Sequence, residues 1–467
     1  MGRHRTFPPG AGDRSHCLTG RLAAESDQMS AADAVRAEIA LQKVVTAYVV
    51  TGLLFLVLPG TFLGVWNLVS ISGQHSPGTL SPAWLQAHGH AQLFGWLGTF
   101  IIGIGYYSLS KMRGLMPFGA RRAWTSWLLW TLGVSLRWVA NVTEFDWRIL
   151  LPLSATLQLA AFAIFFVTVS RHKPAASAIK RKRAETWMLF VMASTVAFLL
   201  ALLVNLGIAA ILALTAAHPE IPHWLDQRYL FLAGWGFPVL AVWSFNARWL
   251  PVFLGLDEPH DRKLRVAMGG LLAGLAAAAA GYFGAATLLL FCAGALAADA
   301  LHVFRRSRKP AKTLGVSPLL PLFLRAAYVW LLVAAALGIY AACGDIHGGI
   351  WGASRHALTV GFLATMVFGI GQRVLPAFCG MRVLFSKHLM GISLILLNAG
   401  CFLRVGSEIP AYEANWHLGW ILLPVSAITE LSAVTLFGLN MAVTLLLPPP
   451  TAAMRRPISL PVLPQTS

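Results

Sequence analysis

Histidine residues open two long apolar segments of this 467-residue chain, and they occupy the same position in each segment. The first segment, HAQLFGWLGTFIIGIGYYSLSKMRG, covers residues 90–114, and the second, HALTVGFLATMVFGIGQRVLPAFCG, covers residues 356–380. Imidazole is costly to place in hydrocarbon, and it is a good ligand for haem iron or copper. Two helices that face each other through His90 and His356 would therefore be able to hold a metal centre between them.

The composition is that of an integral membrane protein. Hydrophobic residues make up 57% of the chain and charged residues only 12%, whereas about a quarter of a soluble domain is charged. The main partner of the chain is therefore the lipid bilayer. The formal net charge is +18, but the lysines and arginines gather in short loops, where they set orientation. We expect no nucleic-acid binding.

The apolar stretches predict an all-α polytopic fold of about twelve transmembrane helices, since each span needs about twenty residues. The candidate spans are 44–66, 88–110, 123–142, 149–170, 186–215, 229–250, 264–281, 284–304, 321–343, 354–376, 388–406 and 418–446. Loops rich in lysine and arginine alternate along the chain with loops that carry acids instead, such as Glu144, Asp345, Glu408 and Glu413. This alternation places both termini in the cytoplasm of a protein of the inner (cytoplasmic) membrane.

The chain divides into one membrane domain and two flanking segments. We expect residues 1–43 to form a largely disordered cytoplasmic segment, residues 44–447 a single transmembrane domain, and residues 448–467 a disordered, proline-rich tail. No cleavable signal peptide is evident, and Met29 is an alternative start to Met1. The five cysteines form no CxxC pair, so covalent CxxCH attachment of haem is not expected.

A third copy of the motif lies between the other two but lacks the histidine. Residues 231–255 read FLAGWGFPVLAVWSFNARWLPVFLG, with Phe231 at the histidine position. The copies fall on the second, sixth and tenth predicted helices, so the unit is four helices, with repeats of about 44–170, 186–304 and 321–447. The alternative is that small residues recur by chance because they let membrane helices approach closely.

The sixth and tenth helices share the pattern Arg-x-Leu-Pro near their predicted cytoplasmic ends. We expect Pro251 and Pro376 to end these helices. We expect Arg248 and Arg373 to extend to the membrane interface.

A haem between two membrane helices needs two axial imidazoles, small residues beside the macrocycle, and cations for the propionates. His90 and His356 are the candidate axial ligands, and the residues near them that supply space are Gly95, Gly98 and Gly361. Arginines near the predicted outer helix ends are candidates for the propionates, namely Arg137, Arg355 and Arg404. The alternative is that both histidines are satisfied polar residues at helix starts.

A second metal site is a further hypothesis. His88 and His90 are two positions apart, so they point about 200° away from each other on a regular helix. One of them is then expected to face a second site or the outer surface. His347 and His417, with His223, are candidates to complete such a site, with copper as the metal. The alternative for each is an interfacial or loop histidine.

Two acids lie within predicted helices. Glu430 is deep in the last helix, and Asp299 is nearer the inner end of the eighth. A charge at such a depth is costly, so each carboxyl must be protonated or paired. A proton relay is one reading, and a hydrogen bond to a neighbouring helix is the plainer one, which we favour for Asp299.

The histidine motifs resemble those of a known family. HGHAQLFGW at 88–96 and RHALTVGFLATMVFGIGQRVLPAFCG at 355–380 resemble the NnrS family of bacterial haem- and copper-containing membrane proteins. They are more distantly similar to subunit I of the haem–copper oxidases. The resemblance implies a twelve-helix, pseudo-threefold core with haem b held by His90 and His356, with His88 a further candidate, and it allows copper.

The chain departs from the oxidase pattern. Copper ligands of an oxidase come from the sixth and seventh helices, where this chain has Phe231 and no histidine respectively. Reduction of oxygen or nitric oxide at a two-metal centre is therefore not expected. The resemblance implies instead a role in the nitric oxide and denitrification-related stress response or in electron transfer, with respiratory or denitrification components as partners.

Two other functions remain open from the sequence. A secondary transporter would have a central polar cavity, which we would expect around Glu430 and Asn205. A membrane sensor or assembly protein would bind haem without turnover.

Overall fold

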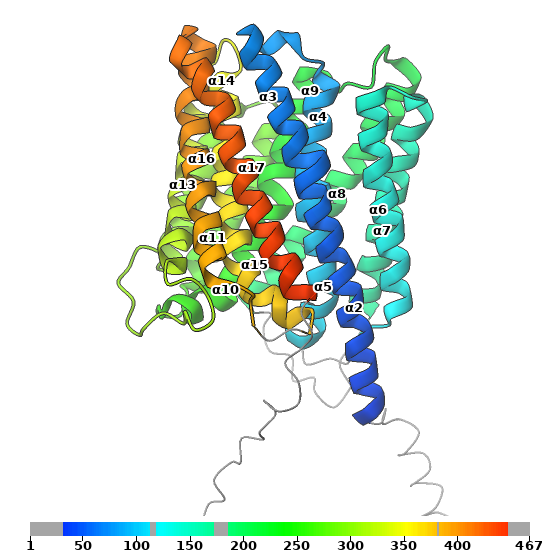
Figure 1. Ribbon diagram of the computed structural model, residues 1–467, viewed down its shortest axis with the longest axis vertical. Coiled ribbons are helices and arrows are strands. Elements are labelled where there is room, and N and C mark those ends of the chain that lie inside the picture. The colour runs from blue at the N-terminus through cyan, green and yellow to red at the C-terminus, as the bar shows by residue number, and fades with distance from the viewer. Residues whose placement is uncertain (1–30, 113–117, 172–184, 381–382, 447–467) are drawn as a thin grey trace, which may run out of the picture.

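Helices form nearly all of the ordered structure. The computed structural model describes residues 31–112, 118–171, 185–380 and 383–446, and in these ranges the chain forms helices and no strand. The helices run side by side between two ends of a single bundle (Figure 1). The predicted tail, the choice between Met1 and Met29, and most of the basic loop around residue 180 lie outside the described residues.

Within the described ranges the helices join into twelve continuous rods. Eight rods are single α-helices: α6 (Ala120–Thr143), α7 (Trp147–Arg171), α8 (Thr186–Thr215), α11 (Asp261–Ala279), α12 (Phe283–Ala300), α13 (Leu320–Gly344), α16 (Lys387–Ala414) and α17 (His417–Leu446). The other four contain a wider π-helical segment. They are α2–η1–α3 (Ala31–Phe55, Leu56–Phe62, Leu63–Gln74), α4–η3–α5 (Pro82–His90, Ala91–Gly98, Thr99–Met112), α9–η5–α10 (His223–Phe231, Leu232–Gly236, Phe237–Leu254) and α14–η6–α15 (Gly349–His356, Ala357–Ala364, Thr365–Phe378).

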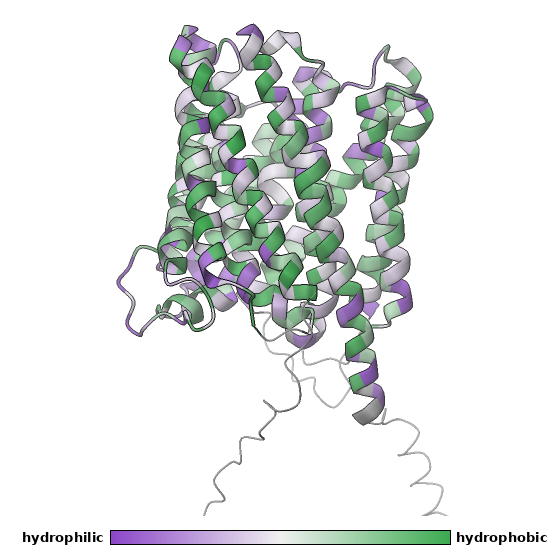
Figure 2. Ribbon diagram, viewed as in Figure 1, coloured by the Kyte–Doolittle hydropathy of each residue, from purple (hydrophilic) through white to green (hydrophobic). Residues whose placement is uncertain are grey.

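The predicted all-helical membrane fold is confirmed. Ten rods of the described chain are long and apolar enough to cross a membrane, and hydrophobic residues occur along the whole length of the helices (Figure 2). The other two predicted spans correspond to α6 and α11. Both begin with charged residues, Arg121 and Arg122 in α6 and Asp261 to Arg265 in α11, which shorten the apolar part of each helix.

The three motif-bearing rods share features that fit a four-helix repeat. The π segments η3, η5 and η6 begin directly after His90, Phe231 and His356. The same three rods are the most buried of the ten apolar spans. In each repeat the third and fourth rods pack against each other, as α6 with α7, α11 with α12, and α16 with α17.

Two predicted boundaries differ from the structure. The first rod begins at Ala31, so residues 31–43 are helical and not disordered. The eleventh rod continues through Pro410 to Ala414, which places Glu408 inside a helix and not in a loop. A proline costs one hydrogen bond but does not end a helix whose neighbours hold it in place.

The sixth and tenth rods end near glycine and not at proline. Pro251 and Pro376 lie inside α10 and α15, each of which continues beyond its proline. Gly255 and Gly380 then adopt left-handed backbone with φ of 67° and 82°, a conformation that favours glycine after a helix. Arg248 lies at this end, 3.1 Å from Glu185.

The close packing of α6 against α7 provides a test of the fold. A Cβ atom added at Gly133 of α6 would lie 2.9 Å from the backbone oxygen of Ser154 on α7, whereas one added at Gly207 of α8 would meet nothing within 4 Å. We expect Gly133→Ala to lower the free energy of unfolding by about 1–3 kcal/mol and Gly207→Ala to leave it unchanged or raise it. Thermal unfolding in detergent checks both, and equal effects of the two variants would contradict this packing.

Candidate functional site

The two histidines of α4 face different neighbours, and His88 is the one associated with His356. The charges of His356 and Arg404 act on His88, whereas His90 lies beside Arg137 and Gln158. The side chains of α4 therefore diverge, as their spacing predicts. The structure does not bring the predicted pair, His90 and His356, together in the same set of interacting side chains.

Five polar side chains from four rods form what we call the His356 cluster: His88, His356, Arg404, Glu408 and Glu430. The ring nitrogen Nδ1 of His356 lies 3.4 Å from Glu408 Oε2, and an Arg404 nitrogen lies 3.0 Å from Glu408 Oε1. Glu430 of α17 is within electrostatic reach of His356, Arg404 and Glu408. Glu408 is 2% exposed and Arg404 7% exposed, so the ion pair is buried.

Both histidines of the cluster are oriented through Nδ1. His88 Nδ1 lies 2.9 Å from the carbonyl oxygen of Gly60, and His356 Nδ1 lies 2.9 Å from that of Gly352. A carbonyl oxygen only accepts hydrogen bonds, so each Nδ1 carries a proton, and in the neutral imidazole each Nε2 has a free lone pair. This is the arrangement that metal-bound histidines usually have.

Local structure fixes where His88 lies. Ser81 accepts a hydrogen bond from the Ala83 amide and caps α4, and Gln86 exchanges two hydrogen bonds with the backbone of Ile221. On the facing rod, the π segment η1 contains Pro59 and presents the Gly60 carbonyl to the imidazole.

Two carboxyl groups fix the start of the helix that carries His356. Glu413 accepts hydrogen bonds from the amides of Ile346, His347 and Gly349, and Asp345 accepts them from Gly348 and Trp351. Negative groups are favoured at a helix N-terminus. Burial raises the pKa of the Asp345 carboxyl, which also hydrogen-bonds Glu413.

Glycines leave room for the cluster, but they are not the predicted ones. A Cβ atom at Gly64 would lie 2.6 Å from the His88 ring, one at Gly352 would lie 2.2 Å from a Glu408 oxygen, and one at Gly400 would lie 2.6 Å from Glu430 Cγ. The predicted glycines instead admit neighbouring side chains. Gly95 packs against Phe55 and Val134, Gly98 against Trp130 and Phe198, and Gly361 against Trp330.

The three predicted arginines have different surroundings. Arg404 belongs to the His356 cluster, and its Nε and Nη1 atoms are buried without a hydrogen-bond partner. Arg355 donates to Gln227 and is within electrostatic reach of Glu408 and Asp226. Arg137 lies beside His90, away from these contacts.

The histidines proposed for copper do not converge. His347 and His223 are exposed, and the ring of His417 lies 5.8 Å from that of His75, which stacks on Trp420. No group of three or more histidine, cysteine or acidic side chains able to hold a metal ion occurs in the described part of the chain. A copper site built from His88, His347 and His417 therefore has no geometric support.

The two acids that the sequence places within helices, Asp299 and Glu430, have different surroundings. Asp299 pairs with Lys263 of α11 at 2.6 Å, so the predicted bond to a neighbouring helix is confirmed. Glu430 packs against Gly400, and its Oε1 atom is buried without a partner.

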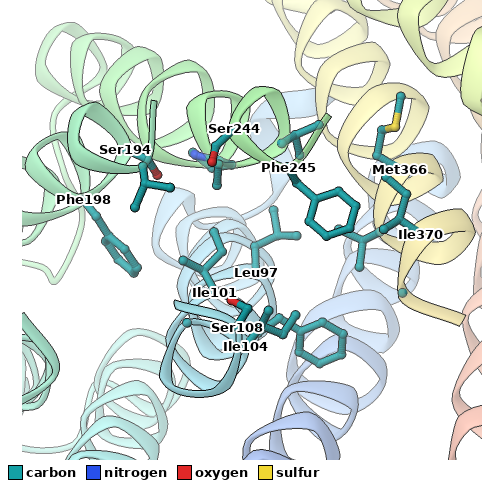
Figure 3. Close-up of a pocket in the computed structure, with 18 of the residues that line it drawn as sticks. Leu97, Ile101, Ile104, Ser108, Ser194, Phe198, Ser244, Phe245, Met366 and Ile370 are labelled. Carbon is teal, nitrogen blue, oxygen red and sulfur yellow. The ribbon is translucent and has the colours of Figure 1, made fainter. Parts of the chain in front are cut away.

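An apolar cavity of about 200 Å³ lies among the three motif-bearing rods and α7 and α8 (Figure 3). Its labelled lining includes Leu97, Ile101, Phe198, Phe245 and Met366, with three serines. Neither Glu430 nor Asn205 lines it, so the cavity lacks the polar groups that we expected of a transporter.

Comparison with known proteins agrees with this architecture. Residues 254–441 match the model of a domain of unknown function, DUF8744. No curated protein matches the chain. Among solved structures, a chain of a haem–copper terminal oxidase dimer determined by cryo-EM matches with a TM-score of 0.69 and 13% identity, over 88% of this chain and 85% of that one. The chain has the fold of that oxidase chain.

Sequence reasoning missed Glu408 as a site residue. Its position four residues after Arg404, which lies one helical turn away, was the available signal.

The buried ion pair of Arg404 and Glu408 leads to a prediction about stability. Glu408→Leu leaves Arg404 buried without its partner and is expected to cost about 3–5 kcal/mol, and adding Arg404→Met should recover most of this loss. The exposed pair of Glu144 and His218 supplies the control, since Glu144→Gln should change stability by less than about 0.5 kcal/mol. Denaturant unfolding measures all three, and a double variant no more stable than Glu408→Leu would contradict the pairing.

Proposed function

We propose that this chain is a haem-binding membrane protein that holds one haem b between α4 and α14, with His88 and His356 as axial ligands, and that it transfers electrons. The observation that carries the proposal is that both imidazoles are held by the same kind of hydrogen bond. Each donates its Nδ1 proton to a backbone carbonyl, at 2.9 Å in both cases, and in the neutral form each has an Nε2 lone pair for a metal.

The surrounding charges suit the anionic edge of a haem. Arg404 has two buried nitrogen atoms without partners, and charge-assisted hydrogen bonds to propionates would satisfy them. Arg355, within electrostatic reach of the same cluster, is the second candidate. Glu408 already neutralises part of this positive charge and, through its contact with His356, favours the orientation of that imidazole.

The residues favour electron transfer over reduction of a gas. Haem iron supplies a one-electron redox couple when bound, and its potential follows the axial ligands and burial. Two histidine ligands would leave no coordination site on the iron free for a gas. At the equivalent site of the sixth rod, Phe231 packs against Phe283 at 5.6 Å and Trp351 at 5.7 Å, and these aromatic side chains supply no metal ligand.

The fold and the resemblance of the histidine motifs suggest a biological role. The fold is that of a haem–copper terminal oxidase chain, and the histidine motifs resemble the NnrS family. We therefore place the chain in the inner membrane of a bacterium, in the nitric oxide and denitrification-related stress response, with respiratory or denitrification components as electron partners. Its cluster lies nearer the end of the bundle that carries acidic loops, so exchange of electrons is expected there.

Spectroscopy of variants tests the ligand assignment. Purified protein from haem-replete cells should show a six-coordinate, low-spin haem that binds no carbon monoxide when reduced. His88→Ala and His356→Ala should each lose haem or gain carbon monoxide binding, because an axial position opens. His90→Ala should keep the wild-type spectrum, and His223→Ala serves as an exposed control.

The opposite pattern would overturn the assignment. If His90→Ala removed the haem while His88→Ala left the spectrum unchanged, His90 would be the ligand.

A further inference from the structure

A second group of buried polar side chains lies on the other side of the second rod. His90 of α4, Arg137 of α6, Gln158 of α7, Asn205 of α8 and Tyr229 of α9 form what we call the Arg137 cluster. Arg137 Nη1 lies 3.4 Å from Asn205 Oδ1, and His90 lies beside both Arg137 and Gln158. Tyr229 is within electrostatic reach of Arg137. None of the five contributes to the His356 cluster or to the proposed haem site.

Each member of the Arg137 cluster is almost fully buried and incompletely bonded. The exposed fractions are 7% for His90, 2% for Arg137, 6% for Tyr229, and 0% for both Gln158 and Asn205. The atoms without a hydrogen-bond partner are His90 Nε2, Arg137 Nε, Gln158 Oε1, Asn205 Nδ2 and Tyr229 OH. His90 and Gln158 are close enough to interact with each other. Buried polar atoms are normally satisfied, so the remaining donors, Arg137 Nε, Asn205 Nδ2 and Tyr229 OH, indicate a bound group.

The chemistry of these atoms selects a small anion. Arginine remains charged even when buried, and among the described residues no carboxylate lies within ion-pair distance of Arg137. Asp226 is within electrostatic reach of Arg137, but it also interacts with Arg355 and His223 and is therefore shared among three groups. The asparagine nitrogen and Arg137 Nε are donors, and the tyrosine hydroxyl and the imidazole are each able to donate. Only the glutamine oxygen is restricted to accepting.

The enclosure limits the size of the ligand. The ring of Phe94 stacks on His90 at 4.7 Å and faces Tyr229 at 6.3 Å, so apolar surface closes one side. Arg137 is less than about two helical turns from the end of α6, which keeps the site near the acidic-loop end of the bundle. We propose that the Arg137 cluster binds a small monovalent inorganic anion in the membrane interior, separately from the proposed haem.

Nitrate is the probe for the first test. We expect the Tm of the purified protein to rise with nitrate concentration at constant ionic strength, because a ligand that binds only the folded state stabilises it. Sulfate, larger and divalent, should not reproduce the effect. Arg137→Gln should weaken the apparent nitrate affinity by roughly tenfold or more. Arg148→Gln, which changes an exposed arginine of α7, should keep the wild-type response.

A second variant keeps the test decisive if Arg137→Gln does not fold. Asn205→Asp places a carboxylate where the amide oxygen now lies 3.4 Å from Arg137, so the protein supplies its own counter-ion. This variant should have a higher Tm than wild type in nitrate-free buffer and should lose the response to nitrate.

Two results would overturn the proposal. One is the absence of any nitrate response in the wild-type protein, which would mean that the cluster holds water only. The other is an Asn205→Asp variant that responds to nitrate as wild type does. Neither result bears on the haem spectrum, so failure here is distinguishable from failure of the proposed function.

Discussion

A charged side chain placed within hydrocarbon must be neutralised by the protein itself, because no water is present to solvate it. Glu408 meets this requirement through Arg404, and it also contacts the imidazole of His356. Several neighbouring elements are arranged around these three side chains. Gly352 leaves space for the side chain of Glu408, and Gly400 leaves space for that of Glu430. The eleventh rod continues past Pro410, and the helix of His356 begins on amides held by Asp345 and Glu413.

The repeated rods explain how one scaffold provides three different environments. Each of η3, η5 and η6 starts after the same motif position, and that position holds His90, Phe231 or His356. Polar clusters surround the two histidines, and aromatic rings surround the phenylalanine. The chemistry between each of these rods and its neighbours therefore differs with the residue at its motif position.

The sequence was sufficient for the helices and insufficient for the side chains. Apolar runs of about twenty residues and alternating loop charges predict the twelve rods because both follow from the thickness and polarity of the bilayer. The rotation of α4 about its axis decides whether His88 or His90 faces α14. The two-residue spacing shows only that these two side chains point in different directions. Glu408 was missed because a span length of about twenty residues ends before it. The glycines at 95, 98 and 361 were misassigned because close packing and ligand space require the same residue.

The central claim is that His88 and His356 are oriented to coordinate one haem. Electron paramagnetic resonance of the oxidised protein, purified from haem-replete cells and combined with a haem-to-protein ratio, tests it most directly. The account predicts one haem per chain with the low-spin signal of two imidazole ligands. A colourless preparation, or a haem with a high-spin five-coordinate signal, would contradict it.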